Sequence, residues 1–171
     1  MKRRSFLAGT AVAGAAALAC RRQKSPYRTL SDAEAQTLAA LCDLIIPPDQ
    51  DPGAAWAGAV QFLDIQLKRH YRKYRDVYRS GLSKAEAIAA QKFGGRCLAE
   101  LSSAQQLECA QELERSEKEF FNLLVGHTMQ AYYGSPRHGG NREYASWRML
   151  HVPIAPARGR NQYDLTKDRR A

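Results

Sequence analysis

Residues 31–46 read SDAEAQTLAALCDLII, and this stretch decides the fold class because it carries both a helix start and a helical face. Ser31 and Glu34 form a capping box, in which each side chain bonds the other residue's backbone amide at the first turn. An apolar face follows at helical spacing, made by Leu38, Leu41, Cys42 and Ile45. The adjacent Pro47 and Pro48 end the pattern. The stretch therefore predicts an amphipathic helix.

The next segment predicts a long second helix over residues 55–79. Its apolar stripe has helical spacing and consists of Val60, Leu63, Leu67, Tyr71, Tyr74 and Tyr78. Gly81 is expected to end this helix, because glycine is a poor helix former. Ser83 and Glu86 repeat the capping-box pattern, so a short helix is expected from there to the glycine pair at 94–95.

Two further helices complete the predicted domain over residues 31–133. A third capping box is either Ser102 with Gln105 or Ser103 with Gln106, and the helix it opens has Leu107, Ala110 and Leu113 on one side. The following helix has a face made by Phe121, Leu124, Val125, Thr128 and Tyr132. No segment shows sustained β alternation. The sequence predicts an all-α fold, an irregular bundle of four to five helices.

The character of the chain changes at Gly134, after which Gly, Pro, Asn and Arg dominate without clear periodicity. Loops longer than about 12–15 residues are usually functional or disordered. Residues 134–156 carry apolar groups to bury, Tyr144, Trp147, Met149 and Leu150. They predict a long ordered C-terminal arm that lies on a partner or on the domain. Residues 157–171 are predicted to be a flexible basic tail.

The first nineteen residues predict an export signal, with a basic start, an apolar run and the small-x-small site Ala17-Leu18-Ala19. The adjacent Arg3 and Arg4, followed by Phe6 and Leu7, are typical of a twin-arginine signal, which implies a periplasmic protein exported in the folded state. An ordinary signal or a membrane anchor is the alternative. The apolar run is shorter than the roughly 20 residues that a spanning helix needs. Residues 20–30 read as a basic tether.

The chain carries a net charge of +9, and removal of the signal's three basic residues leaves +6. A positive balance suits nucleic acid, an anionic membrane or an acidic protein partner, and export argues against nucleic acid. The Tyr, Lys and Arg run at 68–79 could bind nucleic acid through stacking and charge. The helical spacing favours tyrosines that point inward and a solvated basic face.

Four cysteines show no C-x-x-C pair, so neither a zinc ribbon nor a redox dithiol is indicated. Cys20 directly follows the cleavage site, which leaves lipidation open. Cys97 and Cys109 flank a predicted helix corner and could pair in an oxidising compartment. Cys42 lies on an apolar stripe and is expected to be an inert core thiol.

No catalytic site can be assembled from the sequence. The four histidines have no metal-ligand spacing, no serine lies in a G-x-S-x-G setting, and no glycine-rich loop links a strand to a helix. We therefore expect no metal and no cofactor in this chain.

The most specific stretch after the signal begins at residue 126. Its helix ends in Tyr132 and Tyr133, and Pro136-x-x-Gly139-Gly140-Asn141 and Trp147-Arg148 follow. This pattern resembles the gluconate 2-dehydrogenase subunit 3 family over about residues 27–153. His127 and Gln130 depart from it, since more varied or acidic residues are common there.

The resemblance implies a non-catalytic small subunit. Its implied partner is an FAD-containing large subunit of the glucose-methanol-choline type, which oxidises a sugar or sugar acid and lacks an export signal of its own. The small subunit would carry that folded flavoprotein across the membrane and stabilise it. Many such complexes pass electrons to a membrane c-type cytochrome, which supplies haem c.

The expected partner interface is the arm, with Pro136, Arg137, Gly139, Gly140, Asn141, Trp147 and Arg148 as its residues. Glycine allows positive φ and close backbone approach, and Trp and Arg are enriched at interface hot spots. The alternative is that Gly-Gly-Asn only turns the chain and Trp147 fills the domain's own core. Two other functions stay open: a stand-alone periplasmic enzyme, and an exported or lipid-anchored basic adaptor unrelated to dehydrogenases.

Overall fold

The structure is a computed structural model of the chain, and it describes residues 25–152. This range contains helices and turns but no strand, which confirms the all-α prediction. Six α-helices and four short 3-10 helices occur in it, more α-helices than the sequence predicts. In chain order they are α1 (Asp32–Ile45), α2 (Ala59–Lys68), η1 (Arg72–Tyr74), α3 (Arg75–Lys92), η2 (Leu98–Glu100), α4 (Ser103–Ser116), α5 (Lys118–Tyr133), η3 (Pro136–His138), η4 (Arg142–Tyr144) and α6 (Ala145–Met149).

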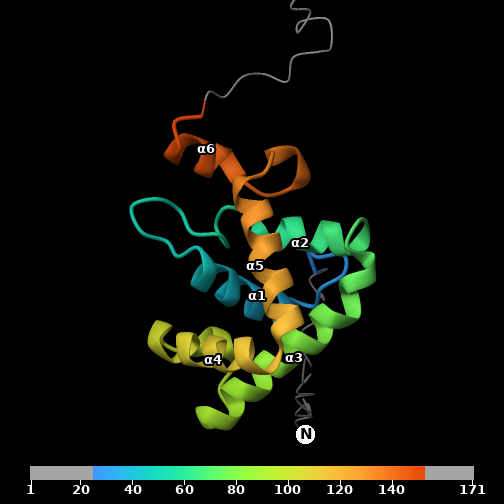
Figure 1. Cartoon of the computed structure of the whole chain (residues 1–171), viewed down its shortest axis with the longest axis vertical. Coiled ribbons are helices and arrows are strands. Elements are labelled where there is room, and N and C mark those ends of the chain that lie inside the picture. The colour runs from blue at the N-terminus through green and yellow to red at the C-terminus, as the bar shows by residue number, and fades with distance from the viewer. Residues whose placement is uncertain (1–24, 153–171) are drawn as a thin grey trace, which may run out of the picture.

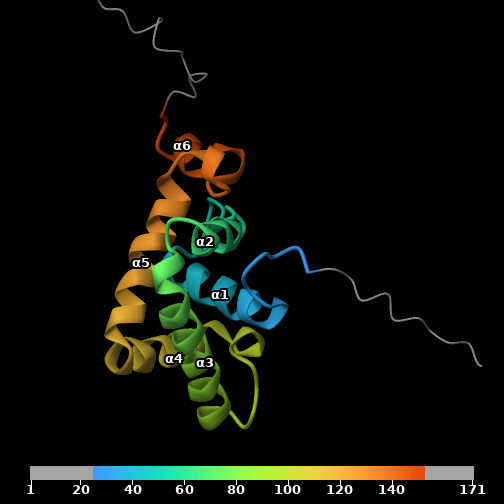
Figure 2. The same ribbon diagram turned by 90° about the vertical axis from the view of Figure 1, so that its right-hand side faces the viewer.

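Helix α1 lies at the centre of the bundle and contacts α2, α3, α4 and α5. Helix α5 runs along the length of the domain, with α3 and α4 beside its lower part and α2 and α6 toward its upper end (Figures 1 and 2). Leucines from these helices form much of the solvent-free core, including Leu38, Leu41, Leu63, Leu82, Leu113 and Leu124. The long apolar faces seen in the sequence therefore meet around α1.

Two of the predicted helix starts are confirmed. At α1, the Ser31 hydroxyl accepts a hydrogen bond from the Glu34 amide (3.2 Å), and the Glu34 carboxylate accepts one from the Ser31 amide (2.8 Å). At α4, the sequence left two registers open, and the structure has the capping box between Ser102 and Gln105. These side chains satisfy amides that the first turn of a helix leaves without partners.

The predicted helix over 55–79 is wrong in both its start and its continuity. Helix α2 begins only at Ala59, and the chain leaves helical geometry after Lys68. The tyrosine-rich stretch then forms η1, and α3 begins at Arg75. The Arg75 Nε donates a hydrogen bond to the Leu67 carbonyl (2.7 Å), which satisfies a carbonyl at the end of α2 and fixes this corner.

Gly81 does not end a helix, and Ser83 does not begin one, because α3 runs through both positions. A Cβ at Gly81 would lie 2.2 Å from the Phe120 ring, so the glycine lets α3 and α5 pack closely. The Glu86 carboxylate is engaged elsewhere: it accepts hydrogen bonds from the Thr37 hydroxyl (2.6 Å) and the Leu98 amide. These distant contacts explain why Gly81 does not end a helix and why Glu86 does not complete a capping box with Ser83.

The three described cysteines are free thiols. The pairing that the sequence left open is not formed: Cys97 is exposed at the start of η2, whereas Cys109 is buried on α4. Cys42 is buried against the Thr128 hydroxyl (3.4 Å). Burial raises its pKa to about 12, so this thiol stays protonated and inert, as expected.

Several predicted features lie outside the described residues. They are the twin-arginine residues Arg3, Arg4, Phe6 and Leu7, the lipidation candidate Cys20, and the tail 157–171. In the described part of the chain, no helix has the length and apolar character needed to cross a membrane.

Candidate functional site

The predicted arm folds back onto the end of α5, and Asn141 holds it there. The Asn141 side chain is fully buried; its Nδ2 donates to the Gly134 carbonyl (2.9 Å) and its Oδ1 accepts from the Ser146 amide (3.0 Å). Ser146 in turn donates its hydroxyl proton to the Tyr132 carbonyl (2.6 Å). One amide side chain thus links the end of α5 to the start of α6.

The two glycines before Asn141 are required by close backbone packing. Gly139 has a φ of +98°, in the region that favours glycine. A Cβ at Gly140 would lie 2.2 Å from the Ala131 carbonyl oxygen of α5. Gly58 approaches from the other side, where a Cβ would meet the Gly139 carbonyl oxygen at 2.8 Å. The arm is therefore clamped between α5 and the start of α2.

Trp147 also packs against other residues of its own chain. Its indole Nε1 donates to the Tyr133 carbonyl (3.0 Å), and its ring lies 5.6 Å from that of Tyr144. The side chain is half-buried, so part of the ring remains at the surface. The Trp147 indole accordingly secures α6 to α5 without entering the leucine core.

The seven residues predicted for the partner interface are thus divided by the fold. Gly140 and Asn141 are buried in this chain and shape the arm, which is the role that the alternative reading gave them. Gly139, Pro136 and Trp147 are half-buried, whereas Arg137 and Arg148 are exposed. Any direct contact with a partner would have to come from the half-buried and exposed residues, not from Gly140 and Asn141.

A cluster of exposed apolar side chains surrounds the arm. We call it the arm-end patch, and it consists of Trp56, Tyr133, Tyr144, Leu150 and Val152. Neighbouring arm residues contact several of its members: the Arg142 guanidinium lies over the Trp56 ring (5.7 Å), and Trp147 packs on the Tyr144 ring and bonds the Tyr133 carbonyl. Exposed apolar groups that cluster in this way mark interaction surfaces.

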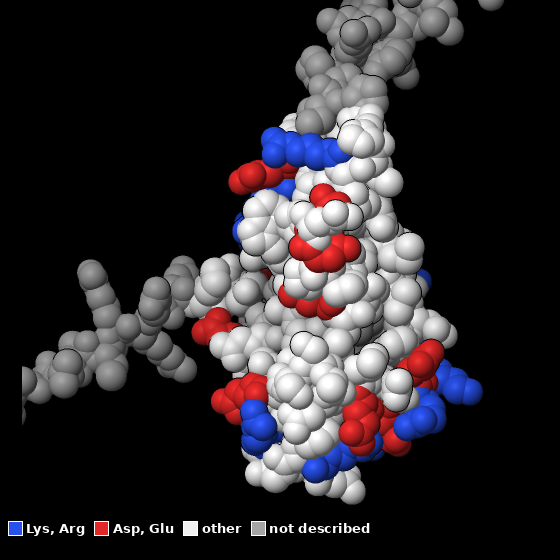
Figure 3. All heavy atoms as spheres, turned by 90° about the vertical axis from the view of Figure 1, so that its left-hand side faces the viewer, with Lys and Arg blue, Asp and Glu red and all other residues white. Residues whose placement is uncertain are grey.

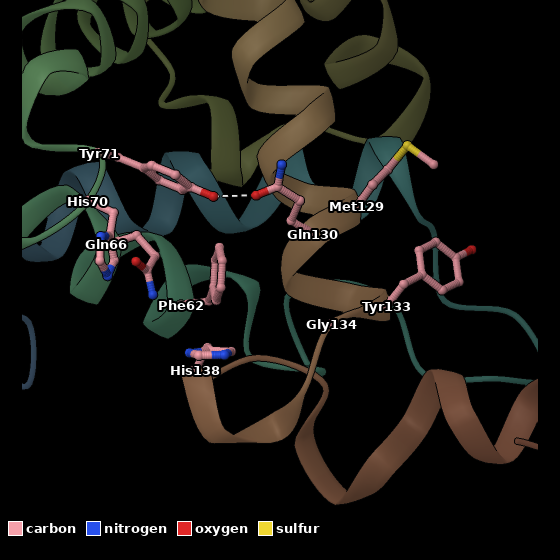
Figure 4. Close-up of a pocket in the computed structure, with 9 residues that line it drawn as sticks. All are labelled: Phe62, Gln66, His70, Tyr71, Met129, Gln130, Tyr133, Gly134 and His138. Carbon is pink, nitrogen blue, oxygen red and sulfur yellow. Dashed lines mark hydrogen bonds between the residues drawn. The ribbon is translucent and has the colours of Figure 1, made fainter. Parts of the chain in front are cut away.

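A hollow of about 640 Å³ borders the patch beside α5. Figure 4 shows the Tyr71 hydroxyl directed at Gln130, with the Phe62 ring below this hydrogen bond and His138 beyond it. Met129 and Tyr133 project from α5 on the other side and extend the apolar lining. This hollow lies between the end of α2, α5 and the start of the arm.

The arm carries unusual backbone geometry. Asn141, Glu143 and Tyr144 all have positive φ, at 45°, 53° and 60°. Left-handed geometry is uncommon for residues other than glycine, and most of all for bulky ones such as tyrosine. Strained backbone persists only where the surrounding contacts impose it, and it is concentrated at functional sites.

A second polar cluster is internal and shows no catalytic arrangement. Tyr78 and His127 are buried, and the Tyr78 hydroxyl lies 2.9 Å from the His127 Nδ1. Tyr71 stacks on the His127 ring at 3.9 Å between centroids. Burial lowers the pKa of His127, which keeps the imidazole neutral at pH 7. This cluster packs α3 against α5.

The described residues also contain no group of three or more His, Cys, Asp or Glu side chains placed to hold a metal ion. In residues 25–152, the geometry thus offers surfaces for binding.

A comparison with protein families gives a match that covers most of the chain. The sequence pattern of the family described as gluconate 2-dehydrogenase subunit 3 matches residues 32–153. The chain belongs to the gluconate 2-dehydrogenase subunit 3 family. No curated protein and no solved structure matches it.

Membership of the gluconate 2-dehydrogenase subunit 3 family confirms the resemblance seen in the sequence. It makes the chain an accessory subunit of a dehydrogenase complex, associated with other subunits. The matched residues include all six helices and the arm through Val152. The Gly-Gly-Asn turn and the arm-end patch therefore lie inside the family's common region.

Two residues of this subunit matter more than the sequence indicated. Asp64 is buried in α2, and its carboxylate accepts hydrogen bonds from the consecutive amides of Arg28, Thr29 and Leu30 at 2.7–3.0 Å. The last part of the predicted tether is therefore fixed to α2. Trp56 was missed because its link to Arg142 joins two distant segments, which no local pattern reveals.

Proposed function

We propose that this chain is the non-catalytic small subunit of a periplasmic, FAD-dependent sugar or sugar-acid dehydrogenase. It escorts the folded flavoprotein through twin-arginine export and stabilises it afterwards. The large subunit is of the glucose-methanol-choline type and holds the FAD, and a membrane c-type cytochrome accepts the electrons. The chain itself carries no cofactor.

The observation that carries this proposal is the arm-end patch. Five of the seven exposed large apolar side chains in the described domain lie on or beside the arm, a segment within the family match. An accessory subunit needs such a surface, because the apolar centre of an interface supplies most of its binding energy. Arg137, Arg142 and Arg148 are exposed on the same arm, and their guanidinium groups are donors suited to a polar rim.

The strained backbone of the arm agrees with a docking role. Left-handed geometry at Glu143 and Tyr144 precedes α6 and sets its direction. A rigid, preshaped surface loses less conformational entropy on binding than a mobile one. We therefore place the flavoprotein contact on the arm-end patch, with the buried Gly140 and Asn141 as its support.

Co-expression with the proposed flavoprotein subunit, followed by affinity recovery, tests the docking site. Leu150→Ser and Trp147→Ala are each expected to lower recovery at least tenfold, since truncating a hot-spot side chain commonly costs about 2 kcal/mol or more. Far-ultraviolet circular dichroism of the free subunit should change little, because α1 to α5 do not depend on either side chain.

Leu107→Ser is the matched control. Leu107 on α4 is 50% exposed, and Leu150 after α6 is 53% exposed, so the two changes remove similar apolar surface. Leu107→Ser should leave recovery unchanged. Equal recovery of all three variants and the parent chain would show that the partner binds elsewhere. Unfolding by Trp147→Ala would instead place Trp147 among the residues that hold the domain together.

A further inference from the structure

A dense basic surface lies where α2 ends and α3 begins. We call residues 68–79 the basic corner; its cations are Lys68, Arg69, Arg72, Lys73, Arg75 and Arg79, and Asp76 is its one acidic residue. The chain turns through η1 here, so the cations are distributed over two helix ends and the turn between them. In Figure 1 this corner is at the right, away from α6 at the top.

The corner is a local excess in a domain without net charge. Residues 25–152 contain 15 Lys and Arg and 15 Asp and Glu. Acidic residues are concentrated elsewhere, on α4 and the start of α5: Glu108, Glu112, Glu114, Glu117 and Glu119. The face opposite the corner shows Asp and Glu at its centre, with Lys and Arg at its edges (Figure 3). The described domain thus has a strong internal charge asymmetry.

The cations of the corner are not used to hold the domain together, with one exception. In the described part of the chain, ion pairs are formed by Lys92 with Glu108 and by Arg115 with Glu112, and none involves the corner. Arg75 is half-buried and bonds the Leu67 carbonyl. The other five side chains are exposed. Clustered, unpaired cations repel one another, so their positions are unexplained by stability.

Aromatic rings lie between these cations. Tyr74 is half-buried, and the Lys73 ammonium lies 4.7 Å from its ring centroid, whereas Tyr71 stacks on His127 and bonds Gln130. Tyrosine has an apolar body and a polar tip, which suits the boundary between lipid headgroups and acyl chains. Exposed lysine and arginine beside such rings are typical of surfaces that lie on membranes.

We propose that the basic corner binds the surface of an anionic phospholipid bilayer. This role goes beyond the dehydrogenase complex and uses cations that lie outside the arm-end patch, although His70 and Tyr71 of the corner line the same hollow as Tyr133 of the patch. A flat anionic surface fits cations that are distributed over a corner and line no part of the hollow beside α5. Each Lys or Arg near such a surface contributes to its attraction for anionic headgroups.

The sequence next to the domain supports lipid over an acidic protein as the partner. The described domain is neutral, so the net charge of +6 that remains after removal of the predicted signal belongs to residues 20–24 and 153–171. Arg21, Arg22 and Lys24 directly precede Ser25, whose following residues are fixed to α2 through Asp64. Basic segments that flank a domain add to its non-specific attraction for anionic lipid.

Sedimentation with vesicles tests the proposal on the full chain. One set of vesicles contains phosphatidylcholine with 30% phosphatidylglycerol, and the other phosphatidylcholine alone. The variant K68Q/R69Q/R72Q/K73Q should lower the partition coefficient on anionic vesicles at least tenfold, since each surface charge contributes about fivefold. Binding of the parent chain should also weaken as salt rises from about 0.1 to 0.5 M.

The matched control is K84Q/R96Q/R115Q/K118Q, which removes the same charge from exposed residues at the other end of the domain. It should retain most of the binding, and both variants keep the same terminal segments. A milder pair, K68Q/K73Q against K84Q/K118Q, repeats the comparison with lysines that make no hydrogen bond in the described part of the chain. Equal losses in corner and control variants would overturn the proposal, as would equal binding to both vesicle types. Binding of the chain to an acidic protein without any binding to the anionic vesicles would also overturn the proposal.

Discussion

At the residue scale, Asp64 shows how one buried charge organises two segments. Its carboxylate lies inside the domain, and three backbone amides of residues 28–30 donate to it. A buried charge is tolerated when hydrogen bonds replace its hydration. Here the bonds also place Leu30 and Ser31, so that the cap of α1 starts in the right position.

Asp64→Ala should destabilise the folded chain by about 3 kcal/mol, since it removes charged hydrogen bonds and leaves buried amides without acceptors. Urea denaturation followed by circular dichroism measures the change. Asp76→Ala is the control, because Asp76 is exposed in the first turn of α3 and should cost at most about 1 kcal/mol. Similar losses from both substitutions would contradict the role assigned to Asp64.

Single residues also mark the limit of what the sequence predicts about the site. Gly140 and Asn141 stand out in the sequence because Gly-Gly-Asn favours positive φ or close packing, and the structure gives Asn141 a positive φ and Gly140 a close approach to α5. The surface against which this turn packs is not predictable, because a local turn motif carries no information about its tertiary neighbours. The packing surface is set by the carbonyls of Ala131, which lies in α5, and of Gly134, which caps the end of that helix.

At the element scale, helix starts are predicted where the capping side chains have no other partner. The boxes at Ser31 and Ser102 form, whereas the box at Ser83 does not, because Glu86 bonds Thr37 and the Leu98 amide. At Gly81 the reason for glycine is also a tertiary contact, the close packing of Phe120 from α5, and not the end of a helix. Local patterns fail where a tertiary contact uses the same residue. The five-residue helix α6 is missed since it is too short to show a period.

The arm as an element depends on its close approach to α5, and Gly140→Ala tests this. The new Cβ would lie 2.2 Å from a backbone oxygen, which cannot move aside without shifting α5. We expect at least tenfold lower recovery of the flavoprotein, with the helical content of α1 to α5 retained. Circular dichroism and affinity recovery on the same samples provide the measurement.

Gly126→Ala is the control for that substitution. Gly126 lies in the same helix that the arm contacts, and a Cβ there would meet no atom within 4 Å. Alanine is the better helix former, so this variant should be neutral or more stable by up to about 1 kcal/mol. If Gly140→Ala bound the flavoprotein as well as Gly126→Ala does, the packing of the arm would not matter for docking.

At the scale of the whole molecule, the chain separates its tasks along its length. Residues 1–19 predict export, the neutral helical domain presents the arm-end patch, and the flanking segments carry the net positive charge. The family was predictable because its motif is local in sequence. The arm-end patch was predictable only in part, because Trp56 joins it from a distant segment, whereas the basic corner is one contiguous run that the sequence shows directly.

Replacing Arg3 and Arg4 together by lysine tests the escort role. The change keeps the charge of the signal, so any loss of export reports recognition of the arginine pair and excludes a purely electrostatic effect. If the flavoprotein crosses the membrane only as a folded complex with this chain, both proteins should remain in the cytoplasm. Cell fractionation with immunodetection of both chains, together with dye-linked dehydrogenase activity in the periplasm, provides the measurement.

The control replaces Arg21 and Arg22 by lysine, an adjacent pair outside the predicted signal, and should leave export intact. Normal periplasmic flavoprotein activity in the R3K/R4K variant would mean that the large subunit reaches the periplasm without this chain.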